Sequence, residues 1–71
     1  MINYLVIFEK TKTGYSAYSP DLPGCIATGP TKLQTKKNIH AAIQFHLDGM
    51  REEHIKFPKP QAESAILTFA E

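Results

Sequence analysis

The strongest constraint on the fold is an N-terminal stretch that is apolar on both of its faces. Residues 2–9 are rich in β-branched and aromatic side chains and lack Gly and Pro, which predicts a strand from Ile2 to Glu9. Alternate residues of a strand point to opposite sides, and here both sides are apolar at the centre. This pattern is typical of a central strand that is covered on both faces. Because the 71-residue chain predicts only one helix, we expect a second copy or a partner protein to cover the other face.

Two turns divide the following segment into short strands. The polar run Lys10–Gly14 predicts a hairpin loop in which Gly14 can adopt a positive φ. Tyr15–Ser19 predicts a second strand, and Pro20–Gly24 supplies two prolines and one glycine within a rigid turn. Cys25–Thr28 then predicts a third short strand, which ends at Gly29 and Pro30.

A single amphipathic helix is predicted next. Thr31 and Gln34 fit a capping box, in which each side chain satisfies the other's free amide, and the helix extends to about Glu53. Its apolar stripe recurs at spacings of three and four residues and consists of Ile39, Ala42, Ile43, Leu47 and Met50. Pro58 and Pro60 cannot continue the helix, and residues 64–70 predict a last strand. We therefore expect an α+β fold with the order βββαβ, in which one domain (residues 1–71) packs its helix on one face of an antiparallel sheet.

Phe45 lies off the apolar stripe, on the opposite face of the predicted helix beside Ala41 and Asp48. A large aromatic side chain on a polar face is typical of an interface anchor. These three residues are our candidate protein interface. The alternative is a singly exposed apolar side chain, which is common on protein surfaces.

The sequence offers little for catalysis, cofactors or metals. Cys25 is the single cysteine and fits a small buried hydrophobe, whereas Asp21 fits a turn-forming carboxylate that bonds the backbone amides of its own loop. His40 and His46 are six residues apart and cannot chelate one metal ion from one helix. We therefore expect no enzymatic activity, no cofactor and no metal.

Charge and hydropathy also limit the cellular setting and the partners. The longest apolar run, Leu5–Phe8, is far too short to cross a membrane, and no export signal is visible, so we expect a cytoplasmic protein. Lys32, Lys36 and Lys37 form the one concentrated basic spot. They are candidate nucleic-acid contacts, although a solvated helix face is the simpler explanation.

One set of residues resembles the signature of HicB-like antitoxins. It combines a glycine in the first hairpin, a Pro-Asp-Leu-Pro-Gly-Cys run, and Gly-x-Thr at the start of the helix. The matching residues are Gly14, Pro20, Asp21, Leu22, Pro23, Gly24, Cys25, Gly29 and Thr31. The resemblance implies a truncated RNase H-like domain without catalytic carboxylates. It also implies an antitoxin that dimerises or tetramerises and occludes a HicA-type, mRNA-cleaving toxin.

The function expected from this resemblance is neutralisation of a toxin by protein–protein contact. Because the chain stops just after the last predicted strand, without the DNA-binding segment that many of these antitoxins carry, we do not expect it to bind DNA directly. Two alternatives remain at this stage. One is a homo-oligomeric interaction module that has no toxin partner, and the other is a weak nucleic-acid-binding protein that uses the three lysines.

Overall fold

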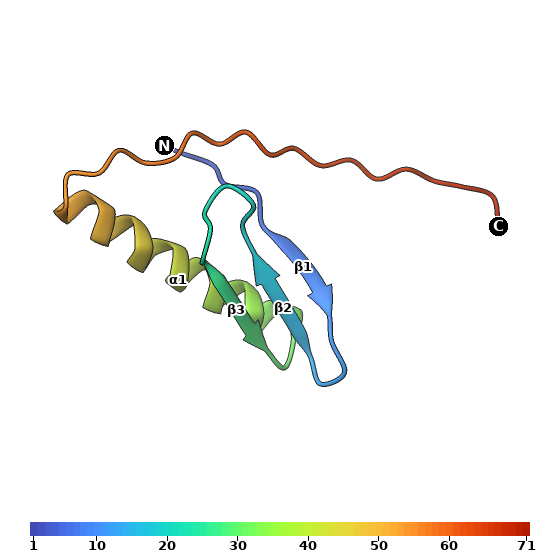
Figure 1. Cartoon of the computed structure of the whole chain (residues 1–71). Coiled ribbons are helices and arrows are strands. Elements are labelled where there is room, and N and C mark those ends of the chain that lie inside the picture. The colour runs from blue at the N-terminus through green and yellow to red at the C-terminus, as the bar shows by residue number, and fades with distance from the viewer.

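The computed structural model describes residues 1–71 as a three-stranded antiparallel sheet with one long helix against it (Figure 1). The strands are β1 (Ile7–Lys10), β2 (Tyr15–Tyr18) and β3 (Ile26–Gly29), in the spatial order β1-β2-β3. The helix α1 spans Lys32–Glu52, and its sheet contacts are mainly with β3 and β2. The α+β class with a single helix on an antiparallel sheet is therefore confirmed. No helix is long and apolar enough to cross a membrane.

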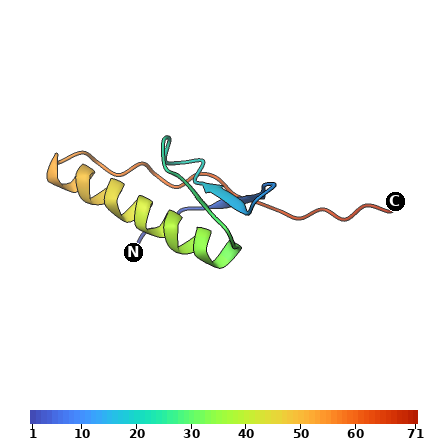
Figure 2. The same ribbon diagram turned by 90° about the horizontal axis from the view of Figure 1, so that it is seen from below.

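The pairing register gives the sheet two different faces. Phe8, Ala17 and Ala27 are aligned across the three strands, and Ala17 is fully buried beneath α1. The neighbouring row of Ile7, Tyr18 and Ile26 points the other way. Figure 2 shows that the helix lies along one side of the sheet only, so this second face is left open.

The helix buries the stripe that its sequence predicts. Ile39 and Leu47 are almost fully buried, and Ala42, Ile43 and Met50 are half-buried along the same side. Thr35 is also fully buried, one turn before Ile39. Its hydroxyl is satisfied there, because it donates a hydrogen bond to the carbonyl oxygen of Thr31 at 2.7 Å. This internal bond lets a polar residue extend the buried side of the helix at little cost.

The helix begins where the sequence predicts but is only half capped. Thr31 is the N-cap residue, and its Oγ1 accepts a hydrogen bond from the Gln34 amide at 3.1 Å. The expected return bond from the Gln34 side chain is not made. That side chain instead donates to Asn38 Oδ1 at 2.9 Å, and Asn38 donates to the carbonyl oxygen of Thr28 at 2.8 Å. A chain of side-chain bonds thus links the first helical turns to the end of β3.

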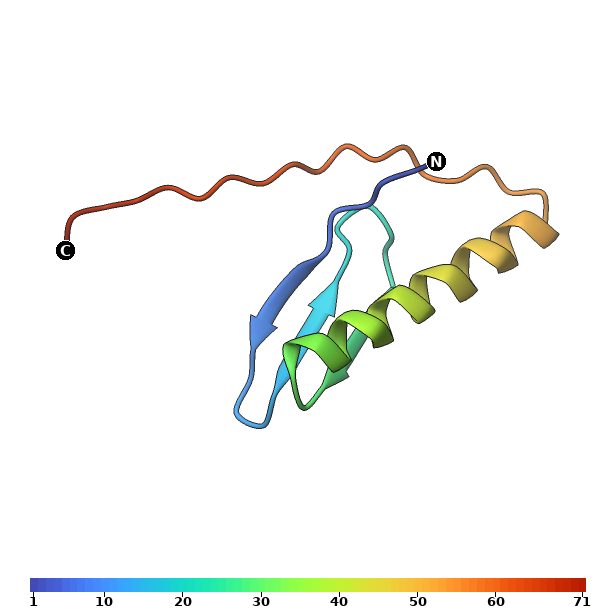
Figure 3. The ribbon, with the colours of Figure 1, turned by 180° about the vertical axis from the view of Figure 1, so that it is seen from behind.

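Three predictions for the strands are wrong. β1 begins at Ile7 instead of Ile2, because Pro20 has no amide to extend the pairing of β2 and the Leu5 carbonyl accepts from the Ser19 hydroxyl at 2.8 Å. β1 also lies at the edge of the sheet, where only β2 pairs with it, and not at the centre. The predicted last strand, residues 64–70, is extended but pairs with no strand of this chain, because its course leads away from both sheet edges (Figures 1 and 3).

The C-terminal region accounts for the elongated shape. The molecule measures 49 × 26 × 19 Å and has a radius of gyration of 14.0 Å. A compact domain of this length has a radius of gyration of about 11 Å. The excess comes from residues 63–71, here called the C-terminal arm, all of which are exposed and run past β1 away from the rest of the chain (Figure 3).

The helix ends in a Schellman motif whose left-handed residue is His54. The amide of His54 donates to the Arg51 carbonyl at 3.1 Å, and that of Ile55 donates to the Met50 carbonyl at 2.8 Å. His54 has a φ of 57°, a conformation that costs a residue with a side chain free energy that glycine does not lose. The motif turns the chain sharply from α1 into the segment that leads to the arm.

We therefore predict that His54→Gly raises the free energy of unfolding by about 1 kcal/mol, since it removes the left-handed strain. Urea unfolding followed by circular dichroism measures the change. Ala41→Gly, at an exposed interior position of the same helix, is the matched control and lowers stability by about 1 kcal/mol. Equal losses in both variants would contradict the strain at His54.

Candidate functional site

The loop between β2 and β3, residues 19–25, is part of the hydrophobic core. Leu22 is fully buried and Cys25 nearly so, and both pack against Leu47 of α1. The loop is held by two tight turns, in which Leu22 donates to the Ser19 carbonyl and Cys25 to the Leu22 carbonyl, each at 3.1 Å. Gly24 has a φ of 89°, which favours glycine at this position. The predicted packing role of Cys25 is confirmed, and its burial raises the pKa of its thiol.

Asp21 does not bond the amides of its own turn, which corrects the sequence prediction. Its Oδ2 atom accepts hydrogen bonds from the backbone amides of Gln61 and Ala62, at 3.1 and 3.0 Å. Nearby, the Tyr4 hydroxyl donates to the Pro58 carbonyl at 2.6 Å. These three bonds fix the start of the C-terminal arm. Pro20 and Pro23, on either side of Asp21 and Leu22, are exposed and stiffen the loop.

The two hairpin glycines are required by close packing. A Cβ atom on Gly14 would overlap the carbonyl oxygen of Gly29, and one on Gly29 would lie 2.7 Å from Thr35 Oγ1. Gly14 does not have the positive φ that its loop position suggested. The close approach instead brings the β1–β2 hairpin against the start of the helix, where Thr31 caps it.

Phe45 lies at the rim of a shallow hollow near the C-terminal end of α1. Its side chain is 82% exposed, as predicted from its place off the apolar stripe. The hollow measures about 350 Å³ and is lined by Phe45, His46, Gly49, Met50, Glu52, Glu53 and Ile55. Exposed apolar side chains with two carboxylates at the edge have the composition of a small protein-binding surface, here called the Phe45 surface.

The two other candidate interface residues contribute less to this surface. Ala41 is exposed on the helix. Asp48 is engaged along the helix, because its Oδ1 accepts from Gln44 Nε2 at 2.9 Å and lies 3.4 Å from Arg51 Nη1. The structure therefore shifts the candidate interface towards Gly49, Met50 and Ile55, beyond the residues that helical spacing identified.

The charges on α1 oppose its dipole at the N-terminal end and are mixed at the C-terminal end, where Arg51 precedes Glu52 and Glu53. Lys32, Lys36 and Lys37 lie in the first two turns, and no acidic residue is present in the first turn. Glu52 and Glu53 lie at the other end, beside the Phe45 surface. Helix stability favours the reverse arrangement by about 0.3–1 kcal/mol per terminal charge. Lys32 is partly engaged, because its ammonium lies 5.4 Å from the Phe8 ring centre, whereas Lys36 and Lys37 are exposed.

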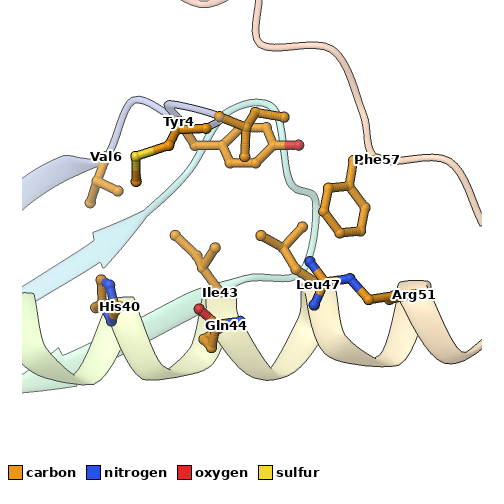
Figure 4. Close-up of a pocket in the computed structure, with 10 residues that line it drawn as sticks. Tyr4, Val6, His40, Ile43, Gln44, Leu47, Arg51 and Phe57 are labelled. Atoms are coloured by element: carbon orange, nitrogen blue, oxygen red, sulfur yellow. The ribbon is translucent and has the colours of Figure 1, made fainter.

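An apolar groove of about 370 Å³ separates the N-terminal segment from the helix (Figure 4). Ile43 and Leu47 point into it from α1, and Phe57 and Arg51 close one end. The remaining lining residues are Met1, Ile2, Tyr4, Val6, His40 and Gln44. Sequence reasoning missed this groove, which forms between the N-terminal segment before β1 and the middle and C-terminal turns of α1.

The open face of the sheet is a further apolar surface. Ile26 is 65% exposed, and it aligns with Tyr18 and the half-buried Ile7. The alternation of side chains predicted that β1 is apolar on both faces. It did not predict the exposed row of Ile7, Tyr18 and Ile26, because Tyr18 and Ile26 lie in short strands of mixed polarity. The structure holds no group of three His, Cys, Asp or Glu side chains that could ligate a metal.

Comparison with known proteins identifies the family. Residues 4–69 match the family described as the HicB-like antitoxin of bacterial toxin–antitoxin systems. The chain belongs to this family. It also resembles a chain of a solved HicA3 and HicB3 toxin–antitoxin complex, with a TM-score of 0.69 and 30% identity over 84% of this chain and 70% of the other. The resemblance drawn from the Pro-Asp-Leu-Pro-Gly-Cys run is thus confirmed.

Relatives of the HicB-like chain occur in a phage, an archaeon and a cyanobacterium. An uncharacterised 14.9 kDa protein of Haemophilus phage HP1, encoded in the rep–hol intergenic region, is 39% identical over 79% of this chain. The match covers 42% of that phage protein, so the chain spans less than half of its length. A UPF0150 protein of Thermoplasma acidophilum is 35% identical, and the match covers 87% of this chain and 91% of the relative. A UPF0150 protein of Synechocystis is 38% identical, and the match covers 80% of this chain and 73% of the relative.

The Tyr4 hydroxyl makes the stability of the fold depend on pH in the alkaline range. Burial raises the pKa of its hydroxyl above the ordinary value of about 10, and the nearby Asp21 carboxylate adds to the effect. The folded state therefore holds this proton more tightly than the unfolded chain does. Its contribution to stability is complete below about pH 10 and is lost as the pH rises through the raised pKa.

We predict that the free energy of unfolding falls more steeply above pH 10 in the parent protein than in Tyr4→Phe, which has no hydroxyl to ionise. Urea unfolding at pH 8, 10 and 11 measures both slopes. Tyr18→Phe, on the open face of the sheet, is the control and keeps the steep fall. The same slope in Tyr4→Phe and the parent would disprove the role of the Tyr4 proton.

Proposed function

We propose that this protein is an antitoxin that binds a HicA-type, mRNA-cleaving toxin and blocks the toxin's access to RNA. The observation that carries the proposal is the likeness to a chain of the HicA3 and HicB3 toxin–antitoxin complex, over 84% of this chain at 30% identity. The residues that match the family model, 4–69, include the loop of residues 19–25 and the whole of α1, which present the surfaces described above. Occlusion of this kind needs shape and charge complementarity and no catalytic group, so the proposed role is not enzymatic.

The Phe45 surface is the part of the molecule best suited to this contact. A toxin that acts on RNA needs a basic surface to hold the phosphate backbone. The Phe45 surface combines an exposed aromatic anchor with Glu52 and Glu53 at its edge, a composition that complements such a basic surface. The basic first turns of α1 would be kept away from the contact at Phe45, since Lys37, the nearest of the three lysines, lies about 12 Å of helix before it at a rise of 1.5 Å per residue.

The proposal predicts that Phe45→Ser weakens binding to a HicA-type toxin by at least ten-fold, because the exposed aromatic anchor of the proposed interface is lost. Purified HicA3 and the HicA-type toxin encoded nearest this gene are the two probes, and calorimetry gives the affinity. Leu33→Ser is the matched control: Leu33 is 66% exposed on the same helix but more than three turns away, and its loss leaves affinity within two-fold.

A growth assay gives the biological counterpart. Co-expression of the parent protein with the toxin restores growth and preserves mRNA, Leu33→Ser does the same, and Phe45→Ser does not. An absence of binding to either toxin would reject the antitoxin role and leave a self-associating module as the function. Loss of binding in Leu33→Ser but not in Phe45→Ser would place the toxin contact elsewhere on the helix.

The negative charges of Glu52 and Glu53, at the edge of the Phe45 surface, lead to a separate prediction. Replacement of Glu52 and Glu53 by Lys slows association with the basic toxin by about ten-fold at low salt, because electrostatic steering is lost. Stopped-flow association at 20 and 300 mM salt measures this, and the difference between variant and parent narrows at high salt. The double change Lys36→Glu and Lys37→Glu is the control. A larger effect from the lysine variant would indicate that the basic end makes the contact.

A further inference from the structure

We propose that the C-terminal arm (residues 63–71) is an exchanged strand, which adds to the free edge of β1 in a second copy of this chain and fills the apolar groove there. The exchange is reciprocal, so two chains form a two-fold dimer. This inference goes beyond the antitoxin function and does not depend on it.

The arm has the character of a strand that has no partner in its own chain. It is fully extended, and its largest side chains are apolar and exposed, with Ile66, Leu67 and Phe69 between 74% and 96% accessible. Single exposed apolar residues are normal, but three within four positions of an extended segment are typical of a strand that pairs with another chain.

The direction of the arm is set at its start. Asp21 accepts hydrogen bonds from the amides of Gln61 and Ala62, and Tyr4 holds the Pro58 carbonyl. From these fixed points the arm runs past β1 and away from the body, as Figures 1 and 3 show from opposite sides. Phe57, at the beginning of this segment, lines the groove, so the chain leaves the groove as it approaches the arm. The arm therefore points away from its own groove and is available to another copy.

The receiving surface matches the arm in length and chemistry. β1 has a neighbour on one side only, and residues 1–6 take part in no backbone–backbone hydrogen bond outside the regular elements. The edge from Ile2 to Lys10 has nine residues, as does the arm, and nine extended residues span about 30 Å. Beside this edge lies the 370 Å³ groove, in which seven of the ten lining residues are hydrophobic. Alternate side chains of an added strand would enter it.

Charge and area also favour a second copy as the occupant. The arm carries Glu63 and Glu71 and no basic residue, whereas the receiving edge and hairpin carry Glu9, Lys10 and Lys12. The net charge is thus −2 on the arm and +1 on the receiving edge and hairpin. Two buried Phe69 side chains alone would cover about 300–500 Å², roughly a quarter of a standard protein–protein interface. The two-fold symmetry doubles every contact.

The exchange also closes the unpaired edge of β1. With an arm from the second copy alongside it, β1 becomes an interior strand of a four-stranded sheet. The free edge, a hazard for aggregation in an isolated chain, is then paired.

Sedimentation velocity over a concentration series tests the proposal on the full chain. We expect a dimer that Phe69→Ser weakens by at least ten-fold, whereas Phe45→Ser, which removes an equally exposed phenylalanine from the helix, changes the dissociation constant less than two-fold. Circular dichroism verifies that both variants stay folded. A protein that is monomeric at every concentration, or a dimer that responds equally to the two variants, would overturn the proposal.

Hydrogen exchange distinguishes an exchanged arm from one that folds back on its own chain. In the dimer the amides of residues 64–70 are protected, and on dilution to monomer the protection is lost; protection that survives in the monomer contradicts the exchange. A synthetic peptide of residues 61–71, added to the Phe69→Ser protein, should protect residues 2–10. Protection elsewhere, or none, also contradicts it. Toxin binding by Phe69→Ser reports separately on the proposed function and is expected to persist.

Discussion

The packing of the loop of residues 19–25 against the helix is the contact on which the rest of the structure depends. Leu22 and Cys25 meet Leu47 in the small buried cluster of the chain, and they join the C-terminal half of α1 to the loop between β2 and β3. The same loop presents Asp21 to the amides of Gln61 and Ala62. One short segment therefore closes the core and also directs the C-terminal arm. Its sequence must satisfy both demands, which explains why two prolines, a buried leucine and a glycine with positive φ occur so close together.

The distribution of charge on α1 is understandable in terms of binding and not of helix stability. Lysines at the start oppose the macrodipole, and at the end Arg51 offsets only part of the charge of Glu52 and Glu53. A short chain with few buried residues has little capacity to absorb this cost. The glutamates adjoin exposed Phe45, whereas Lys32 finds partial compensation over the Phe8 ring. A charge pattern that is unfavourable locally and lies next to an exposed aromatic residue is characteristic of a surface kept for a partner.

The sequence predicts local structure well where neighbouring residues determine it. Thr31 begins the helix, the stripe through Ile39 and Leu47 is buried, and Phe45 is exposed, because a helix is set by contacts three and four residues apart. The failures involve distant partners. The bond from Asp21 crosses forty residues, and the limits of β1 depend on the Ser19 hydroxyl and on Pro20. Neither periodicity nor turn chemistry contains this information. The groove could not be predicted from the sequence either, because residues 1–6 and α1, which line it, are far apart in the chain.

The two strand predictions that the single chain contradicts have one physical origin. A strand is predicted from its side-chain alternation, but it forms only where another strand supplies hydrogen bonds. Residues 2–6 and 64–70 both have suitable side chains, and in one chain both lack a neighbour. Their apolar patterns would be a liability in a permanent monomer, since each exposes an edge that favours uncontrolled association. Pairing one with the other across a two-fold axis satisfies both at once, and it leaves the Phe45 surface on the helix free for a different protein.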